Sequence, residues 1–497
     1  MAAAFLRSHG IDINDEMQRI QFGGSTAHPE DIPKANTEQT RMIVNNASLP
    51  NTPRGSLWTV QLDPHSKTIS TIQAYSPEST PSSGHNTIDA HQALLCPSLC
   101  HPHIHLDKAF LLSHPRHSHL QIQRGDFAEA MEMTGKAKAN FTHEDLLERG
   151  QRVVDESVAA GVTHMRAFVE LDAGVGNKCL DAGLELKGRA EGRCEIQICA
   201  FAQLPLFTAS QGDEDGKVIR GLMKEAAGKK EVEAVGSTPY VEGERAKMEK
   251  NVEWMVSLAI EHQKHIDFHL DYNLDAETEP LVGHVVSTLH AKSWTTSNPG
   301  KTVVLGHCTR LTLFSDDEWR RLKTALGDLP VSFVGLPTSD QFIMGKTLPI
   351  PKLIKEYGFN ACMGVNNIGN AFTPHGSCDP LMTACSGVGV YQAGTERDAE
   401  VLMECPRCET FAKYEHNLTK LISLSGRGHS TVGKYRDETG NGLTTWLKLR
   451  YPPDYQTPVS RPHRSAPHPL ANQTKHRLNK SVHVPIHQVV SFLSDHI

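Results

Sequence analysis

Two histidines separated by a single residue end an apolar run in the segment "CHPHIHLDKAF", residues 100–110. His103 and His105 are followed at once by Asp107 and Lys108, so metal-ligating and charged groups lie within one short stretch. In a β-strand, residues two apart point to the same face. The two imidazoles would then point together and supply half of a metal site. The spacing alone leaves a second interpretation open, in which one histidine is buried and hydrogen-bonded while the other is exposed.

An alternation of helical and apolar strand segments begins at this motif and continues to about residue 370. Counting the strand at the motif, eight strand segments are separated by helical ones. Strict β/α alternation is typical of a parallel sheet with right-handed crossovers, and eight units over this length predict a (β/α)8 TIM-type barrel. A doubly wound open sheet is the alternative, but no glycine-rich phosphate loop opens any of the predicted helices.

Polar or metal-ligating side chains lie at the carboxyl ends of most of these predicted strands. Catalytic groups of (β/α)8 barrels lie at the carboxyl ends of the strands, so residues far apart in sequence would meet there. Four histidines on three strand ends are hard to explain by packing alone. They favour a site for one metal ion over a metal-free structural protein, which stays as an alternative. The residues concerned are His103, His105, Arg166, Gln203, His269, His307, Asn366 and Asn367.

The composition is that of a globular protein without a strongly charged surface. Of the 497 residues, 38% are hydrophobic and 22% are charged, and the formal net charge is −7. This charge gives no electrostatic footprint for nucleic acid, and no apolar run reaches the roughly 20 residues that a transmembrane helix needs. The eleven cysteines are an odd number without a framework spacing, which suits a reducing compartment. The N-terminus fits neither a secretory signal nor a transit peptide, so we expect a cytoplasmic protein.

Four regions are predicted along the chain. Residues 1–40 are a weakly patterned N-terminal extension, and residues 41–97 contain short β-rich runs typical of hairpins. Residues 98–390 form the predicted barrel. Residues 391–497 diverge from this pattern and are expected to be partly sandwich-like or disordered, because their tail is rich in Pro, His and basic residues.

The motifs "PHIHLDK", "IDFHLD", "VVLGHC" and "MGVNNIGNAFTPHG", in this order, resemble the amidohydrolase superfamily. The resemblance is to its cytosine deaminase and N-isopropylammelide amidohydrolase branch, and it covers about residues 40 to 390. It implies a (β/α)8 barrel with a small flanking β-sandwich domain, built from the segments before and after the barrel. It also implies hydrolysis of carbon–nitrogen bonds other than peptide bonds, with water activated on a divalent metal ion, zinc or iron. The fourth strand lacks the lysine with which two-metal members bridge their ions, so one metal is expected.

The resemblance assigns roles residue by residue. His103 and His105 match the metal ligands on the first barrel strand, and His269 matches the ligand on the fifth. His307 matches the histidine that steers the attacking water or the developing oxyanion. Gln203 sits where the deaminase branch has a glutamine that hydrogen-bonds a pyrimidine-like ring.

Two carboxylates that the family uses for proton transfer are absent. Tyr272 stands three residues after His269, where the family has Glu, and Asn366 stands at the position of the Asp that ends the eighth strand. An Asn oxygen coordinates a metal weakly but carries no proton, and a Tyr hydroxyl with a pKa of about 10 is a poor acid at neutral pH. General acid–base help is worth about 10²- to 10⁴-fold. Either the proton transfers are rerouted, or the protein is a catalytically impaired paralogue that binds a small ligand or a protein partner.

Several other side chains have two interpretations. Asp271 is a candidate proton shuttle, yet a structural hydrogen bond is the commoner use of such a residue. Lys108 can meet an anionic substrate or form a salt bridge to a barrel acid. Tyr272 can stack on a substrate or pack, and Arg166 matches an arginine of the branch that is structural or rim-lining. Cys308 resembles a small buried cysteine more than a nucleophile.

Cys405 and Cys408 form a CxxC with His416 nearby, which is half of a zinc motif without a second cysteine pair. An incomplete sandwich would leave the N-terminal strands unpaired, and such an edge favours a homo-oligomer. The expected partner is a small nitrogen heterocycle or cyclic amide, with no nucleic acid and no membrane. The predicted site has metal ligands His103, His105, His269 and Asn366, catalytic residues His307 and Asp271, and substrate contacts Gln203, Tyr272, Arg166 and Lys108.

Overall fold

The computed structural model describes residues 42–49, 52–63, 68–78, 87–210 and 212–405, together with the strands Ile422–Ser425, Thr431–Lys434 and Trp446–Arg450. The predicted N-terminal extension, the basic tail, Cys408 and His416 lie outside the described residues. Within the described part of the chain, no helix combines the length and the apolar character needed to cross a bilayer.

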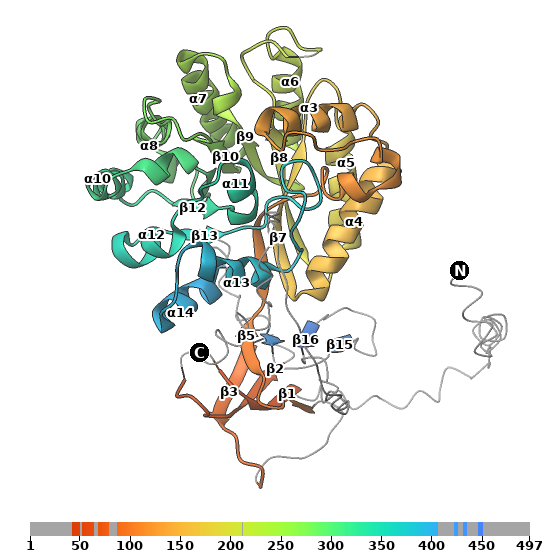
Figure 1. Ribbon diagram of the computed structural model, residues 1–497, viewed down its shortest axis with the longest axis vertical. Coiled ribbons are helices and arrows are strands. Elements are labelled where there is room, and N and C mark those ends of the chain that lie inside the picture. Colours follow the sequence, from red (N-terminus) through yellow and green to blue (C-terminus); the bar gives the residue numbers. More distant parts are fainter. Residues whose placement is uncertain are drawn as a thin grey trace, which may run out of the picture. The chain divides into compact units, whose positions relative to one another are not determined.

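Eight parallel strands form one sheet, and neighbours in the sheet follow the order of the sequence (Figure 1). The sheet closes through Asn366, whose N–H donates to the carbonyl of His103 at 3.0 Å and whose carbonyl accepts from the N–H of His105 at 2.9 Å. The predicted TIM-type barrel is therefore confirmed. Its strands are β6 (Leu99–His105), β7 (Val162–Glu170), β8 (Glu195–Ala202), β9 (Val232–Ser237), β10 (His265–Leu270), β11 (Val303–His307), β12 (Val331–Gly335) and β13 (Ala361–Met363).

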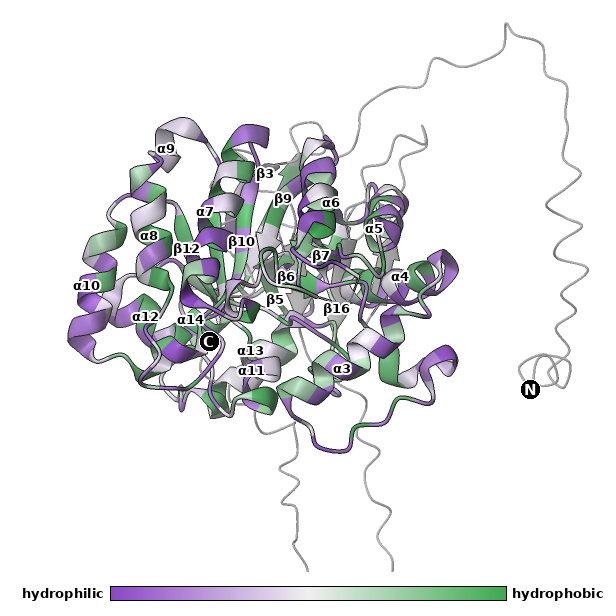
Figure 2. Cartoon of the chain, turned by 90° about the horizontal axis from the view of Figure 1, so that it is seen from above, coloured by the Kyte–Doolittle hydropathy of each residue, from purple (hydrophilic) through white to green (hydrophobic). Residues whose placement is uncertain are grey.

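Amphipathic helices surround the barrel and bury their apolar faces against the strands, while their hydrophilic faces point outward (Figure 2). Burial of each Val or Leu side chain contributes about 1.5–3 kcal/mol, so the outer ring supplies much of the stability. The helices are α3 (Phe127–Lys138), α4 (His143–Ala159), α5 (Lys178–Arg189), α6 (Lys217–Gly228), α7 (Arg245–His262), α8 (Val282–Ala291), α9 (Trp294–Ser297), α10 (Asp316–Leu326), α11 (Pro337–Ile343), α12 (Ile350–Tyr357), α13 (Pro380–Val390) and α14 (Glu396–Glu404).

Short 3₁₀ turns connect several strands to the helices that follow them. They are η1 (Leu111–Ser113), η2 (Pro115–His117), η3 (Pro239–Val241) and η4 (Thr309–Leu313). Helix α14 packs Val401 and Leu402 into the same core as the barrel helices, beyond the predicted boundary at residue 390.

Two smaller sheets account for the β-rich segments outside the barrel. The first contains β1 (Met42–Ala47), β2 (Trp58–Asp63), β3 (Thr68–Ala74) and β4 (Thr87–Asp89), in the order β3-β2-β1-β4. The second joins β5 (Leu94–Pro97) to β14 (Ile422–Ser425), β15 (Thr431–Lys434) and β16 (Trp446–Arg450), with β14 antiparallel to β5. A small β-domain beside the barrel is thus present. The limits of the four predicted regions stay predictions.

Candidate metal centre at the mouth of the barrel

The side chains of His103, His105 and His269 converge at the carboxyl ends of β6 and β10. Nε2 of His269 lies 3.0 Å from Nε2 of His103 and 3.2 Å from Nε2 of His105. All three residues are at most 2% exposed, and burial, which penalises the charged form, holds the pKa of each well below its usual 6.5. The imidazoles are therefore neutral at neutral pH, which is the form that binds metals.

The spacing of the three nitrogen atoms fits a divalent cation. Zinc–nitrogen bonds of about 2.0–2.1 Å in a tetrahedron place neighbouring donor atoms about 3.3 Å apart. The distances of 3.0 and 3.2 Å lie close to that value. One nitrogen of His269 faces two others and carries at most one proton, whereas a single cation would satisfy all three lone pairs together.

Small residues on the neighbouring strands make room for His103. A Cβ on Gly306 would lie 3.2 Å from Cε1 of His103, and one on Gly364 would lie 3.2 Å from its Cβ. Phe168 supports the cluster from below, with its ring centroid 4.1 Å from that of His103 and 4.8 Å from that of His105. The histidines are thus fixed by packing before any ligand arrives.

His307, at the end of β11, forms a dyad with a carboxylate that is not among the predicted site residues. Its Nδ1 lies 2.7 Å from Oδ1 of Asp340, which is fully buried at α11. Oδ2 of Asp340 accepts hydrogen bonds from the N–H of Leu336 and the hydroxyl of Thr347. A carboxylate fixes the proton of His307 on Nδ1, so Nε2 is left as the basic atom. The segment "GLPTSD" after a predicted strand carried the signal, since it places an Asp just past a barrel strand.

A second buried charge cluster lies beside His105. Lys108 and Lys138 both form ion pairs with Glu170, and Lys138 also lies 2.9 Å from Asp172. Burial opposes ionisation of Glu170, but the two lysines outweigh it and lower its pKa to about 2. Lys108 thus makes the salt bridge that was one of its two interpretations, and its Nζ also lies 3.4 Å from Oε1 of Gln203.

Tyr272 and Asn366 both lie at the mouth. The ring of Tyr272 packs 4.3 Å from that of His307, and burial raises its pKa well above 10. Its hydroxyl is therefore a very weak acid at neutral pH. Nδ2 of Asn366 donates to Oγ of Ser339 at 2.9 Å, which turns the amide oxygen toward His103.

The structure does not bring two of the predicted site residues to the mouth. Arg166 lies in the middle of β7 rather than at its end, and its Nη1 donates to Asp267 at 3.0 Å inside the barrel. Asp271 has a left-handed backbone with φ of 49°, and its carboxylate turns away to accept from the N–H groups of Leu281 and Val282. Both residues make structural contacts, because each charge already has a buried partner.

The cavity above the histidines is small and covered by aromatic rings. Its volume is about 20 Å³, which is room for one water molecule. Phe127 of α3 lies 5.7 Å from Tyr272 and 5.9 Å from Phe372, centroid to centroid, and Tyr240 lies 5.9 Å from Tyr272. A substrate the size of a heterocycle needs these rings to move aside.

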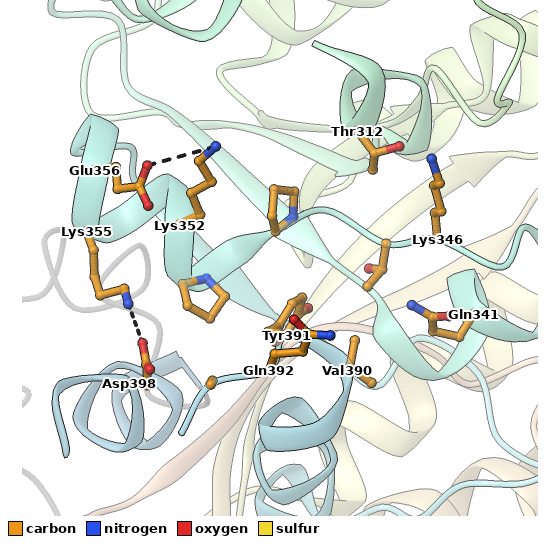
Figure 3. Close-up of a pocket in the computed structure, with 14 residues that line it drawn as sticks. Thr312, Gln341, Lys346, Lys352, Lys355, Glu356, Val390, Tyr391, Gln392 and Asp398 are labelled. Carbon is orange, nitrogen blue, oxygen red and sulfur yellow. Dashed lines mark hydrogen bonds and ion pairs between the residues drawn. The ribbon is translucent and has the colours of Figure 1, made fainter. Parts of the chain in front are cut away.

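A larger cavity of about 540 Å³ lies where α12 meets the segments around α13 and α14 (Figure 3). Lys352 points toward Glu356 there, and Lys355 pairs with Asp398. Among the residues that the structure describes, its lining shares none with the histidine cavity. This larger cavity is not the candidate functional site despite its size. The charged side chains that pair there do not form a converging set of donors for a metal ion.

The closed (β/α)8 barrel thus places three buried histidines and a His–Asp dyad at the carboxyl ends of its strands, which is where the active sites of such barrels lie. The chain is 25% identical over 267 residues to N-isopropylammelide isopropyl amidohydrolase of Pseudomonas sp. (strain ADP). The match covers 52% of this chain and 59% of that relative. No protein-family model matches the chain.

Solved structures share the fold at lower identity. The 5-methylcytosine deaminase from Klebsiella pneumoniae, liganded with 5-fluorocytosine, superposes with a TM-score of 0.65 at 20% identity, covering 85% of this chain and 99% of that one. N-isopropylammelide isopropylaminohydrolase from Burkholderia multivorans ATCC 17616 gives 0.60 at 19% identity, over 78% of this chain and 91% of that one. The Pseudomonas relative supports a relationship of the chain to the amidohydrolase superfamily, and the solved structures show the shared fold.

Proposed function

We propose that the protein hydrolyses a carbon–nitrogen bond, other than a peptide bond, in a small nitrogen heterocycle or cyclic amide. The observation that carries this proposal is the convergence of three neutral, buried imidazoles beside the dyad of His307 and Asp340. The Pseudomonas relative is named as an amidohydrolase and the Klebsiella structure as a deaminase, and both names support the same reaction class.

The metal part of the proposal rests on His103, His105 and His269, with the amide oxygen of Asn366 as a weaker fourth donor. One zinc or iron ion suits this imidazole set. Such an ion, when bound, lowers the pKa of water and polarises the bond to be cleaved.

His307 is proposed to accept the proton of the attacking water and then to return it. Asp340 holds Nδ1 at 2.7 Å, so Nε2 faces the cavity as the base, and the same atom then delivers the proton to the leaving nitrogen. This route replaces both missing family carboxylates with one residue. Lys108 and Gln203, which line the same cavity, are proposed to bind a carbonyl or an anionic edge of the ring.

A second candidate function is ligand binding by a catalytically impaired paralogue. Tyr272 and Asn366 favour it, because neither side chain exchanges a proton at neutral pH in this setting. Substituting Tyr272→Glu together with Asn366→Asp supplies the two family carboxylates. A gain of deaminase activity is expected if the rest of the site is competent, and no gain with metal retained would count against a cytosine-deaminase-like site.

The test of the first candidate is release of ammonia or amine from aminopyrimidines, aminotriazines and cyclic ureides by zinc- or iron-loaded protein. Asp340→Asn should reduce kcat by at least about 100-fold with unchanged metal content, because it disturbs the His307 tautomer. Asp317→Asn, at an exposed Asp of α10, is the matched control and should keep full activity. Loaded protein that turns over no member of the panel would leave the binding function as the better account.

A cytoplasmic location belongs to the same proposal, and a homo-oligomer stays a prediction from the sequence. No disulfide joins any of the ten cysteines in the described ranges, which suits a reducing compartment. The net charge of −7 favours a small-molecule partner over nucleic acid.

A further inference from the structure

A second cluster of metal-ligating side chains lies outside the barrel mouth. His114 and His117 belong to the segment after β6 that contains η2, and Asp145 lies in the first turn of α4. The side chains of His117 and Asp145 are fully buried, and that of His114 is 13% exposed. Neither the sequence motifs nor the proposed reaction uses these three residues.

The distances within the cluster are longer than ordinary hydrogen bonds but close to the edge of a zinc tetrahedron. Oδ1 of Asp145 lies 3.4 Å from Nδ1 of His114 and 3.3 Å from Nε2 of His117. Zinc bonds of about 2.0–2.2 Å to imidazole and carboxylate predict donor separations of about 3.3–3.5 Å. Both distances from the carboxylate therefore fit one shared cation, and the three donor atoms all lie within 4.8 Å of one another.

His117 gives an independent reason to expect a ligand. In the described part of the chain, neither of its ring nitrogens has a hydrogen-bond partner although the residue is fully buried. An unpaired buried polar group costs about 1–3 kcal/mol, so such groups call for an explanation.

The surroundings match the second layer of contacts found around metal ligands. Arg149 donates from Nη2 to Oδ2 of Asp145 at 2.8 Å and from Nε to Oδ1 at 3.1 Å, which orients the carboxylate. Nε2 of His114 lies 3.4 Å from Glu148, so a histidine bound through Nδ1 would have a carboxylate for its other nitrogen. The N–H of Arg116 lies 3.3 Å from the same Nδ1, a long contact that a cation would replace.

Arg149 also connects this cluster to the barrel mouth. Its Nη1 donates to the carbonyls of Asp107 at 2.6 Å and Ala109 at 2.9 Å, in the loop that follows His105. A cation bound to Asp145 would therefore hold the loop after β6 against α4.

We propose that His114, His117 and Asp145 bind a structural Zn²⁺ ion, with water as the fourth ligand, and that this ion fixes the loop after β6. The alternative is a cation-free contact in which Asp145 is neutralised by Arg149 alone. This site is independent of the proposed hydrolase function, since it shares no ligand with the barrel mouth.

The test is zinc content per chain, by elemental analysis after loading with ZnSO₄ and dialysis. Wild type should hold two zinc ions, His114→Gln and His117→Gln one each, and His269→Ala one. His119→Gln, at an exposed histidine of the same segment, is the control and should keep both. His114→Gln changes a residue at the surface of the cluster, so it keeps the test open even if His117→Gln fails to fold.

The outcomes separate the two sites. Equal zinc content in wild type and His114→Gln would overturn the second site whatever His269→Ala shows. Loss of zinc in His114→Gln with none lost in His269→Ala would support the second site and count against the barrel metal. As a further readout, zinc should raise the Tm of His269→Ala but not that of His269→Ala combined with His114→Gln.

Discussion

Glu170 neutralises two buried lysines beside the candidate metal centre. It is 1% exposed and forms ion pairs with both Lys108 and Lys138. Glu170→Gln leaves one excess positive charge buried, and removing one partner of a buried pair costs about 3–5 kcal/mol. We expect a loss of that size in the free energy of unfolding, measured with urea on metal-free protein.

An exposed pair provides the control for this substitution. Glu132 and Lys136 lie 2.6 Å apart on α3 with both side chains more than half exposed. Glu132→Gln should cost less than about 1 kcal/mol, because solvent screens the interaction. Equal effects of the two substitutions would contradict the account of Glu170.

The sequence predicts which residues meet at the mouth better than it predicts where their side chains point. His103, His105 and His269 were found from their spacing and from the family motifs, and they do converge. The direction of the Asp271 side chain depends on the left-handed backbone conformation of this residue, and no sequence motif predicts that conformation. The partner of His307 is Asp340, and that pairing exists only once β11 and α11 are brought together.

At the scale of elements, the barrel requires glycine where neighbouring strands pack tightly. A Cβ on Gly236 of β9 would lie 2.1 Å from the carbonyl oxygen of Asp267 on β10 and 2.9 Å from the ring of Phe201. Gly236→Ala should therefore destabilise the protein by about 3 kcal/mol or more, because backbone on the next strand has to shift. The change is measured from the urea midpoint at constant slope.

A helical glycine serves as the control. It tests whether the loss of stability in Gly236→Ala comes from the contact between β9 and β10 or from adding a methyl group to any glycine. Gly221 lies exposed in α6, and a Cβ added to it would meet no atom within 4 Å. Gly221→Ala should stabilise by up to about 1 kcal/mol through helix propensity. If Gly236→Ala lowered the free energy of unfolding no more than Gly221→Ala, the close contact between β9 and β10 at Gly236 would be contradicted.

The alternation of elements was predictable, because apolar strands and amphipathic helices differ in period. Helix α3 was not predicted, and Phe127 at its start covers the mouth.

At the scale of the whole molecule, the neutral and partly buried His265 limits stability in acid. Burial, aided by Arg166 and Lys301, lowers the pKa of His265 to about 2, where its ordinary value is 6.5. The unfolded chain therefore takes up a proton below pH 6.5 that the folded chain refuses, and stability falls on acidification. Between pH 7 and pH 5 this residue should account for a loss of up to about 2 kcal/mol.

His265→Asn removes the titrating group while keeping an acceptor for the N–H of Thr302, which donates to Nδ1 at 3.0 Å. The variant should lose less free energy of unfolding than wild type over the same pH interval, measured by urea unfolding at both values. Parallel pH profiles for the two proteins would show that His265 takes up its proton equally in both states.

The central claim is the metal site of the barrel, and an anomalous difference map at the zinc edge from crystals of zinc-loaded protein tests it most directly. The account predicts a peak about 2.0–2.1 Å from Nε2 of His103, His105 and His269. Density elsewhere in the molecule, with none between these three nitrogens, would contradict it.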